Sequence, residues 1–136
     1  MSHRTPIVVA LPLAAALLVA LGAQVLSAQP PGFKRTLLQR GDLSMAGREA
    51  VMAQAEIPAG VAVGKHTHPG EEVAYVLEGT LVLEVEGKAP VTLKAGDVFF
   101  VPADTVHDGK NTGTGTAKVL ATYIVEKGKP LATPVR

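Results

Sequence analysis

The chain contains no cysteine among its 136 residues. Disulfide bonds, thiolate metal ligands and thiol nucleophiles are therefore excluded. An excess of positive or negative charge is also lacking, because the net charge is only +1 and no basic cluster is present. Nucleic acids and anionic membranes bind positive surfaces, so this composition predicts no nucleic-acid partner. Histidine and carboxylate side chains remain as the candidates for chemistry.

Helical patterns are missing as well. No stretch shows the period of an amphipathic helix, and no internal repeat is present. Fourteen glycines and ten prolines supply frequent turns, and 47% of the residues are hydrophobic, which is not the composition of a disordered chain. Apolar and polar residues alternate in eight or nine short segments, most clearly in 81–86 and 117–126. The pattern predicts an all-β domain, a sandwich or a barrel.

Residues 1–28 have the pattern of an export signal. A short polar and basic start precedes the apolar run 7–26, and Ser27-Ala28 supplies small residues for cleavage. An uncleaved membrane anchor is the alternative, because about 20 apolar residues can span a bilayer. Pro12 and the many alanines weigh against it. The sequence therefore predicts a periplasmic or secreted protein that meets the membrane only through its signal.

The remaining chain divides into three predicted parts. Residues 29–33 form a linker rich in proline and glycine, and 34–128 form a β-barrel domain. Residues 129–136 are expected to be a C-terminal tail that runs over the surface.

Every histidine after the leader falls into one candidate site. His66 and His68 form a His-x-His pair, whose side chains point to the same face of a strand. A lone pair of this kind is more often a surface feature than a metal site. Here Glu72 follows at turn distance, and His107 returns in a later strand. These additions favour a metal site.

The spacing of these residues resembles the two motifs of the cupin superfamily. The first motif, G-x5-H-x-H-x3-4-E-x6-G, is matched by Gly60, His66, His68, Glu72 and Gly79. The second, G-x5-P-x-G-x2-H-x3-N, is matched by Gly96, Pro102, His107 and Asn111, with Asp104 in place of the middle glycine. Aspartate tolerates turn geometry better than most residues, so this departure leaves the expected turn intact.

The resemblance implies a fold and a ligand set. The fold is a double-stranded β-helix, a jelly-roll β-barrel, and small members of this kind often form homodimers. The implied metal ligands are His66, His68, Glu72 and His107. Glu71 is the alternative carboxylate, but strand alternation turns it to the opposite face.

Three imidazoles and one carboxylate suit a divalent first-row ion such as Mn, Fe, Co, Ni, Cu or Zn. An octahedral ion held by four protein donors keeps about two positions for water, oxygen or substrate. Only neutral imidazole binds a metal, so the affinity should fall as the pH drops through about 6.

Three functions are compatible with this site. The resemblance makes a metal-dependent enzyme of the oxygenase type plausible, acting on a small organic molecule such as a flavonol or catechol. The alternative is a binding module of the cell envelope that holds a metal or small ligand without turnover, and a third possibility is a scaffold without metal. We expect an apolar pocket around the metal. No arginine, acid or base stands out as catalytic, and Tyr75 and Tyr123 are interpreted as packing residues.

Overall fold

The computed structural model describes residues 29–136, so the predicted export signal lies outside the described residues. All regular secondary structure in the described residues is β-strand. This part of the chain contains no helix that is long and apolar enough to cross a membrane. The strands are β1 (Lys34–Asp42), β2 (Arg48–Ile57), β3 (His66–Thr67), β4 (Gly70–Glu78), β5 (Thr80–Val85), β6 (Val91–Lys94), β7 (Val98–Val101), β8 (His107–Asn111), β9 (Ala117–Glu126) and β10 (Thr133–Pro134).

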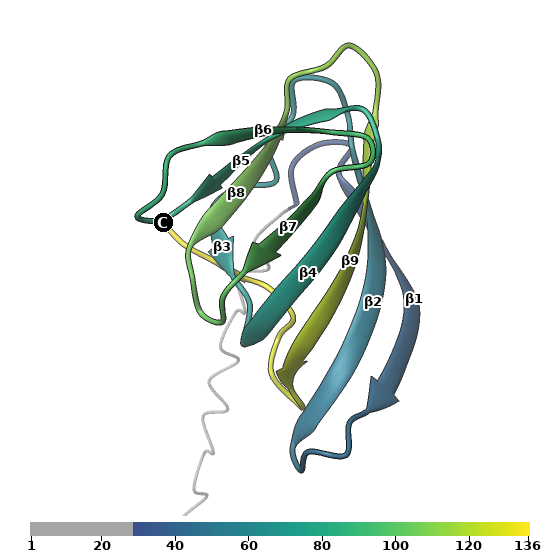
Figure 1. The fold of residues 1–136 in the computed structure, drawn as a ribbon, viewed down its shortest axis with the longest axis vertical. Helices are drawn as coiled ribbons and strands as arrows, with labels where there is room; N and C mark the ends of the chain where they lie inside the picture. The colour runs from purple at the N-terminus through teal and green to yellow at the C-terminus, as the bar shows by residue number, and fades with distance from the viewer. Residues whose placement is uncertain (1–28) are drawn as a thin grey trace, which may run out of the picture.

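Two antiparallel five-stranded sheets form the molecule. One has the strand order β1-β2-β9-β4-β7 and the other the order β10-β3-β8-β5-β6. The long strands of the first sheet run together on one side of Figure 1, and the shorter strands of the second lie opposite them. Consecutive strands repeatedly cross from one sheet to the other. The predicted all-β jelly-roll architecture is confirmed.

The core lies between the sheets because the strands alternate in hydrophobicity. In β9, every second residue from Ala117 to Val125 is buried, and the residues between them are partly exposed. Burying one Val or Leu side chain stabilises the fold by about 1.5–3 kcal/mol. The fully enclosed centre of this core includes Val51, Val76, Leu81, Val101 and Val125.

The segment that carries the histidine pair is less regular than the sequence indicates. Only His66–Thr67 forms a strand, so His68 lies just beyond β3. Two neighbours explain this: Gly64 has a positive φ of 96°, which interrupts the extended backbone, and Pro69 has no N–H for a ladder bond. Of the two histidines, only His66 therefore lies in a strand.

The end of the chain takes part in the second sheet. Residues 133–134, within the stretch assigned to a tail, form β10, which pairs antiparallel with β3. Pro134 lies opposite His66 in this register. The C-terminal residues thus border the segment that carries the histidines.

Asn111, the last residue of the second motif, has a structural role. Its side chain is fully buried, and its Nδ2 donates to the carbonyl oxygens of Ile57 and Gly115 at 2.8 and 2.7 Å. Its Oδ1 accepts from the backbone N–H of Gly113 at 2.8 Å. The side chain therefore joins the loop after β8 to the end of β2.

Candidate metal centre

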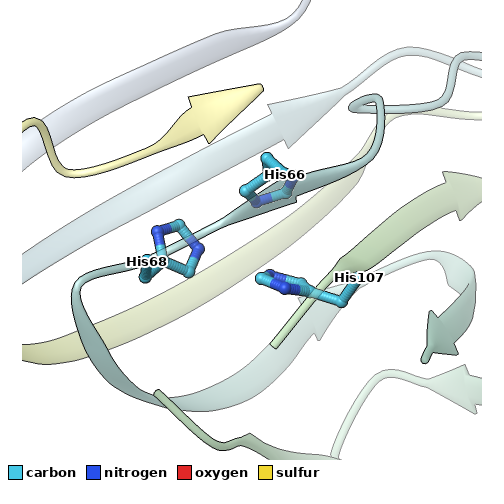
Figure 2. A group of neighbouring side chains, drawn as sticks. All are labelled: His66, His68 and His107. Atoms are coloured by element: carbon cyan, nitrogen blue, oxygen red, sulfur yellow. The ribbon is translucent and has the colours of Figure 1, made fainter. Parts of the chain in front are cut away.

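Three buried imidazoles come together between the two sheets. His66 and His107 are register partners of the β3–β8 pair, and His68 follows β3 directly. One ring nitrogen from each of the three lies within 4.8 Å of the others, which is a spacing that could hold a metal ion. Figure 2 shows the three rings facing one another, with His107 opposite the histidine pair.

Backbone carbonyls fix the orientation of these rings. The Nδ1 of His66 lies 2.6 Å from the carbonyl oxygen of Gly64, and the Nδ1 of His107 lies 2.9 Å from that of Thr105. A carbonyl oxygen can only accept, so each Nδ1 carries the hydrogen and donates. The Nε2 lone pair of a neutral ring is then free for a metal, the usual arrangement of metal-binding histidines.

His68 is anchored from a distant part of the chain. Its Nδ1 donates to the carbonyl oxygen of Leu131 at 2.5 Å. Leu131 lies just before β10, so the C-terminal segment orients this ring. Sequence patterns carry no signal for this contact, because the donor and acceptor are 63 residues apart.

Glu72 brings a carboxylate to the same point from β4 of the other sheet. Its Oε2 lies 3.1 Å from the Nε2 of His107 and 3.3 Å from the Nε2 of His68. The Nε2 of His68 is nevertheless buried without a hydrogen bond. An unsatisfied buried nitrogen is costly in a folded protein. A metal ion at this point would satisfy it, so the donor set fits a metal. Glu71 is only partly buried, and Glu72 is the carboxylate that faces the histidines.

The environment shifts three of these pKa values. Burial lowers the pKa of His66 to about 4, so this ring is neutral at physiological pH. Burial alone would raise the pKa of Glu72, but the imidazoles of His107 and His68 outweigh it and lower the value to about 2. Burial opposes the charged form of His107, and the Glu72 carboxylate overcomes it and raises the pKa of this ring. Without a metal, Glu72 and His107 therefore favour a carboxylate–imidazolium pair.

Known proteins match this chain over the same region. Residues 53–123 match the family model of the cupin domain. This chain belongs to the cupin family. The oxalate-binding protein of Thermotoga maritima is 37% identical over 83 residues, which cover 60% of this cupin and 68% of that protein.

A longer plant protein and a bacterial crystal structure also match this chain. Germin-like protein subfamily 2 member 1 of Arabidopsis thaliana is 46% identical over 63 residues, 43% of this chain but only 29% of that protein. The crystal structure of a cupin superfamily protein from Desulfitobacterium hafniense superposes with a TM-score of 0.58 at 20% identity. The match covers 73% of this chain and 83% of that one. At this identity the likeness concerns the fold alone.

The second motif of this cupin departs from the family pattern at Asp104, and the structure accommodates the change. Asp104 adopts a φ of 55°, a left-handed conformation that aspartate reaches more readily than most residues. Its N–H donates to the carbonyl of His68 at 2.9 Å. Asp104 therefore keeps the turn that the family forms with glycine, and this turn is hydrogen-bonded to the backbone of His68.

Asp108, a partly buried residue of β8, also supports the site. Its Oδ1 accepts a 2.9 Å hydrogen bond from the N–H of Gly64, whose carbonyl in turn accepts from His66. The carboxylate of β8 thus fixes the backbone that orients one histidine.

A cavity of about 40 Å³ adjoins His66, His107 and Glu72. Its lining is mainly apolar, as expected. The apolar side chains include Phe33, Ile57, Val63, Leu81, Leu83 and Phe99.

Two further side chains reach this cavity, namely Tyr123, which was interpreted as a packing residue, and Arg35, which the sequence analysis did not name. Tyr123 lies opposite Glu72 in the β4–β9 register, and its ring centroid is 4.6 Å from that of His68. Burial, and then the charge of Glu72, raise the pKa of this phenol, so it keeps its proton. Alternation in β9 turns Tyr123 inward, and this was the available signal. Arg35 of β1 also lines the cavity, although no arginine stood out in the sequence.

Proposed function

We propose that this cupin binds one divalent transition metal through His66, His68, Glu72 and His107. The observation that carries the proposal is the buried Nε2 of His68, which makes no hydrogen bond and faces the other donors. Mn, Fe, Co, Ni, Cu and Zn all suit this donor set. Such an ion, when bound, polarises the oxygen atoms of a ligand.

The protein's own groups prepare the site for this role. The carbonyls of Gly64, Thr105 and Leu131 hold the Nδ1 hydrogens, so the rings need little reordering. Glu72 supplies a negative charge that offsets part of the charge of the ion. The apolar cavity limits the number of water molecules that can compete for it.

We propose further that the metal holds a small organic ligand in the cavity. Four protein donors leave open positions on a six-coordinate ion. The name of the related oxalate-binding protein supports a small ligand. A cavity of about 40 Å³ is a few times the space that one water molecule needs, so it suits a compact molecule better than a flavonol.

Binding of the ligand without turnover is the first candidate function, and oxygenase-type catalysis is the second. The apolar lining favours catalysis, since a cavity that excludes water protects reactive intermediates from side reactions. In either case the imidazoles and Glu72 fix the ion, and Tyr123 keeps its proton beside Glu72.

Elemental analysis of protein purified without chelators or added metal tests the metal proposal. We expect about one equivalent per chain in the wild type, and strongly reduced content in Glu72→Gln and His107→Ala. Glu71→Gln is the matched control, because this neighbouring carboxylate faces away from the histidines, and it should keep the metal. Less than about a tenth of an equivalent in the wild type, with no uptake on titration, contradicts the proposal.

An oxygen electrode separates the two finer functions. Oxygen consumption by the metal-loaded protein with a catechol, flavonol or diketone, abolished in His107→Ala, would establish an enzyme. Saturable ligand binding without oxygen consumption would establish the binding module.

Export to the periplasm or medium is proposed from the sequence pattern of residues 1–28. Amino-terminal sequencing of the protein recovered from the envelope fraction and the medium is the test. A new terminus near residue 28 or 29 supports cleavage, and an intact Met1 contradicts it.

A homodimer is proposed as well. The outward faces of β4 and β7 expose apolar side chains, namely Val73, Tyr75, Leu77, Val98 and Phe100. Sedimentation velocity should give the mass of a dimer for the wild type and of a monomer for Phe100→Glu. A wild-type monomer across the micromolar range contradicts this proposal.

A further inference from the structure

Arg35 extends from β1 into the same cavity as the proposed metal ligands. Among the described residues that line this cavity, it is the one lysine or arginine, and Glu72 is the one carboxylate. The positive charge of Arg35 also contributes to the lowered pKa of His66, after burial and the other histidines. The guanidinium is therefore electrostatically part of the site.

The guanidinium has donors that the protein leaves unused. Its Nε is buried without a hydrogen bond, and in residues 29–136 no carboxylate forms an ion pair with Arg35. Its Cζ lies 5.4 Å from the ring centroid of Phe33 and 6.0 Å from that of Tyr123. Contacts with aromatic faces hold a guanidinium in place. A hydrogen bond to the Tyr123 hydroxyl, which partly opposes the raised pKa of that phenol, can occupy one N–H group, and the Nε–H stays unused.

The charges of the loaded site are not balanced by the protein. A divalent ion and Arg35 together bring three positive charges, and Glu72 removes one of them. Charges in an apolar cavity are costly unless they are paired. A ligand with two negative charges would neutralise the remainder, whereas a catechol or flavonol would do so only after losing its hydroxyl protons.

We propose that the ligand is a compact dicarboxylate dianion, and that Arg35 binds one of its carboxylates while the other faces the metal; this inference rests on the proposed function. The planar guanidinium presents paired N–H donors that match both oxygens of a carboxylate. The cavity volume of about 40 Å³ restricts the dianion to a chain of very few carbons. Arg35 is thus a residue that determines specificity.

Calorimetric titration of the metal-loaded protein tests this inference, with oxalate and malonate as dicarboxylates and acetate and catechol as comparison ligands. We expect the wild type to bind at least one dicarboxylate more tightly than acetate or catechol. Arg35→Gln should weaken that binding about 10- to 100-fold, because a hydrogen-bonded charge pair is lost. Arg35→Lys keeps the charge without the fork and should give an intermediate affinity.

Arg40→Gln is the matched control. Arg40 lies on the same strand, its side chain is 56% exposed, and it pairs with Glu49 away from the cavity. Its variant should bind the dicarboxylate within about twofold of the wild type. Metal content, measured on the same samples, should be equal in all four proteins.

The outcomes separate the two proposals. A wild type that takes up no metal overturns the proposed function. A wild type that takes up metal but binds no dicarboxylate selectively, or an Arg35→Gln variant with unchanged dicarboxylate affinity, overturns the role of Arg35 alone. If Arg35→Gln does not fold, Arg35→Lys provides the test. The inference is then overturned if Arg35→Lys binds the dicarboxylate with the affinity of the wild type and with the same selectivity over acetate.

Discussion

His66 is buried in its neutral form, and this gives a prediction at the scale of a single residue. Its pKa is lowered by burial from 6.5 to about 4, so the unfolded chain takes up the proton first as the pH falls. The stability contributed by the neutral ring is therefore complete above pH 6.5 and lost by about pH 4. At about 1.4 kcal/mol per pKa unit, the loss amounts to roughly 3 kcal/mol.

Urea unfolding of the metal-free protein at pH 7 and at pH 4.5 measures this effect. The neighbouring groups act in other ranges: the lowered pKa of Glu72 affects stability below about 4.5, and the raised pKa of His107 affects it above 6.5. In His66→Gln the decrease between the two pH values should be clearly smaller. An identical decrease in both proteins would show that His66 does not control this window.

Residue chemistry also decides what could be predicted from the sequence. The spacing of His66, His68 and Glu72 indicated that they would meet, because strand alternation and a turn are local rules. His107 joined them through the resemblance to the second cupin motif. Their role as ligands stays a prediction until metal is measured. Arg35 and Tyr123 could not be placed by such rules, since their distance from the histidines depends on how separate strands pack across the barrel.

Among the elements, β4 depends most on a single glycine. Gly70 begins this strand, and a Cβ there would lie 1.9 Å from the carbonyl oxygen of Ile124 on β9. Because backbone cannot move aside cheaply, Gly70→Ala should separate β4 from β9 and destabilise the protein by at least about 1–3 kcal/mol. The same shift would displace Glu72, two residues on, so metal affinity should fall too.

Thermal and urea unfolding of Gly70→Ala provide the measurement. Gly41→Ala is the control, because Gly41 lies in β1 with ordinary φ and its added Cβ would meet nothing within 4 Å. This variant should match the wild type within about 0.5 kcal/mol. Equal stability of the two variants would mean that the β4–β9 contact adjusts freely.

The elements themselves were largely predictable, with informative exceptions. Long alternating stretches such as 117–126 gave their strands, because burial on one face imposes a period of two. The strand that was expected to hold both histidines contains only His66 and Thr67, since Gly64 and Pro69 interrupt the extended backbone on either side. β10 carries no pattern of its own, being two residues that extend a sheet by pairing with β3.

At the scale of the whole molecule, the C-terminal segment completes the site. Deleting residues 129–136 removes β10 and the Leu131 carbonyl that accepts from His68. Groups that orient metal ligands typically contribute 10- to 100-fold in metal affinity. We expect the truncated protein to keep its β-sheet circular dichroism spectrum and to bind metal about 10- to 100-fold more weakly.

Competition with a chromophoric chelator measures that affinity. Lys129→Ala is the control, since its exposed side chain is lost while the backbone of the segment remains. If the truncated protein binds metal as tightly as the wild type, the His68 ring does not need the Leu131 carbonyl for its orientation.

The hydrogen bond between His68 and Leu131 also has a consequence for biosynthesis. The acceptor follows the donor by 63 residues along the chain. A chain synthesised as far as β9 contains every strand of the sheet β1-β2-β9-β4-β7, but it cannot yet fix this imidazole. We therefore expect the proposed metal site to reach its full affinity only after Leu131 has been added to the chain.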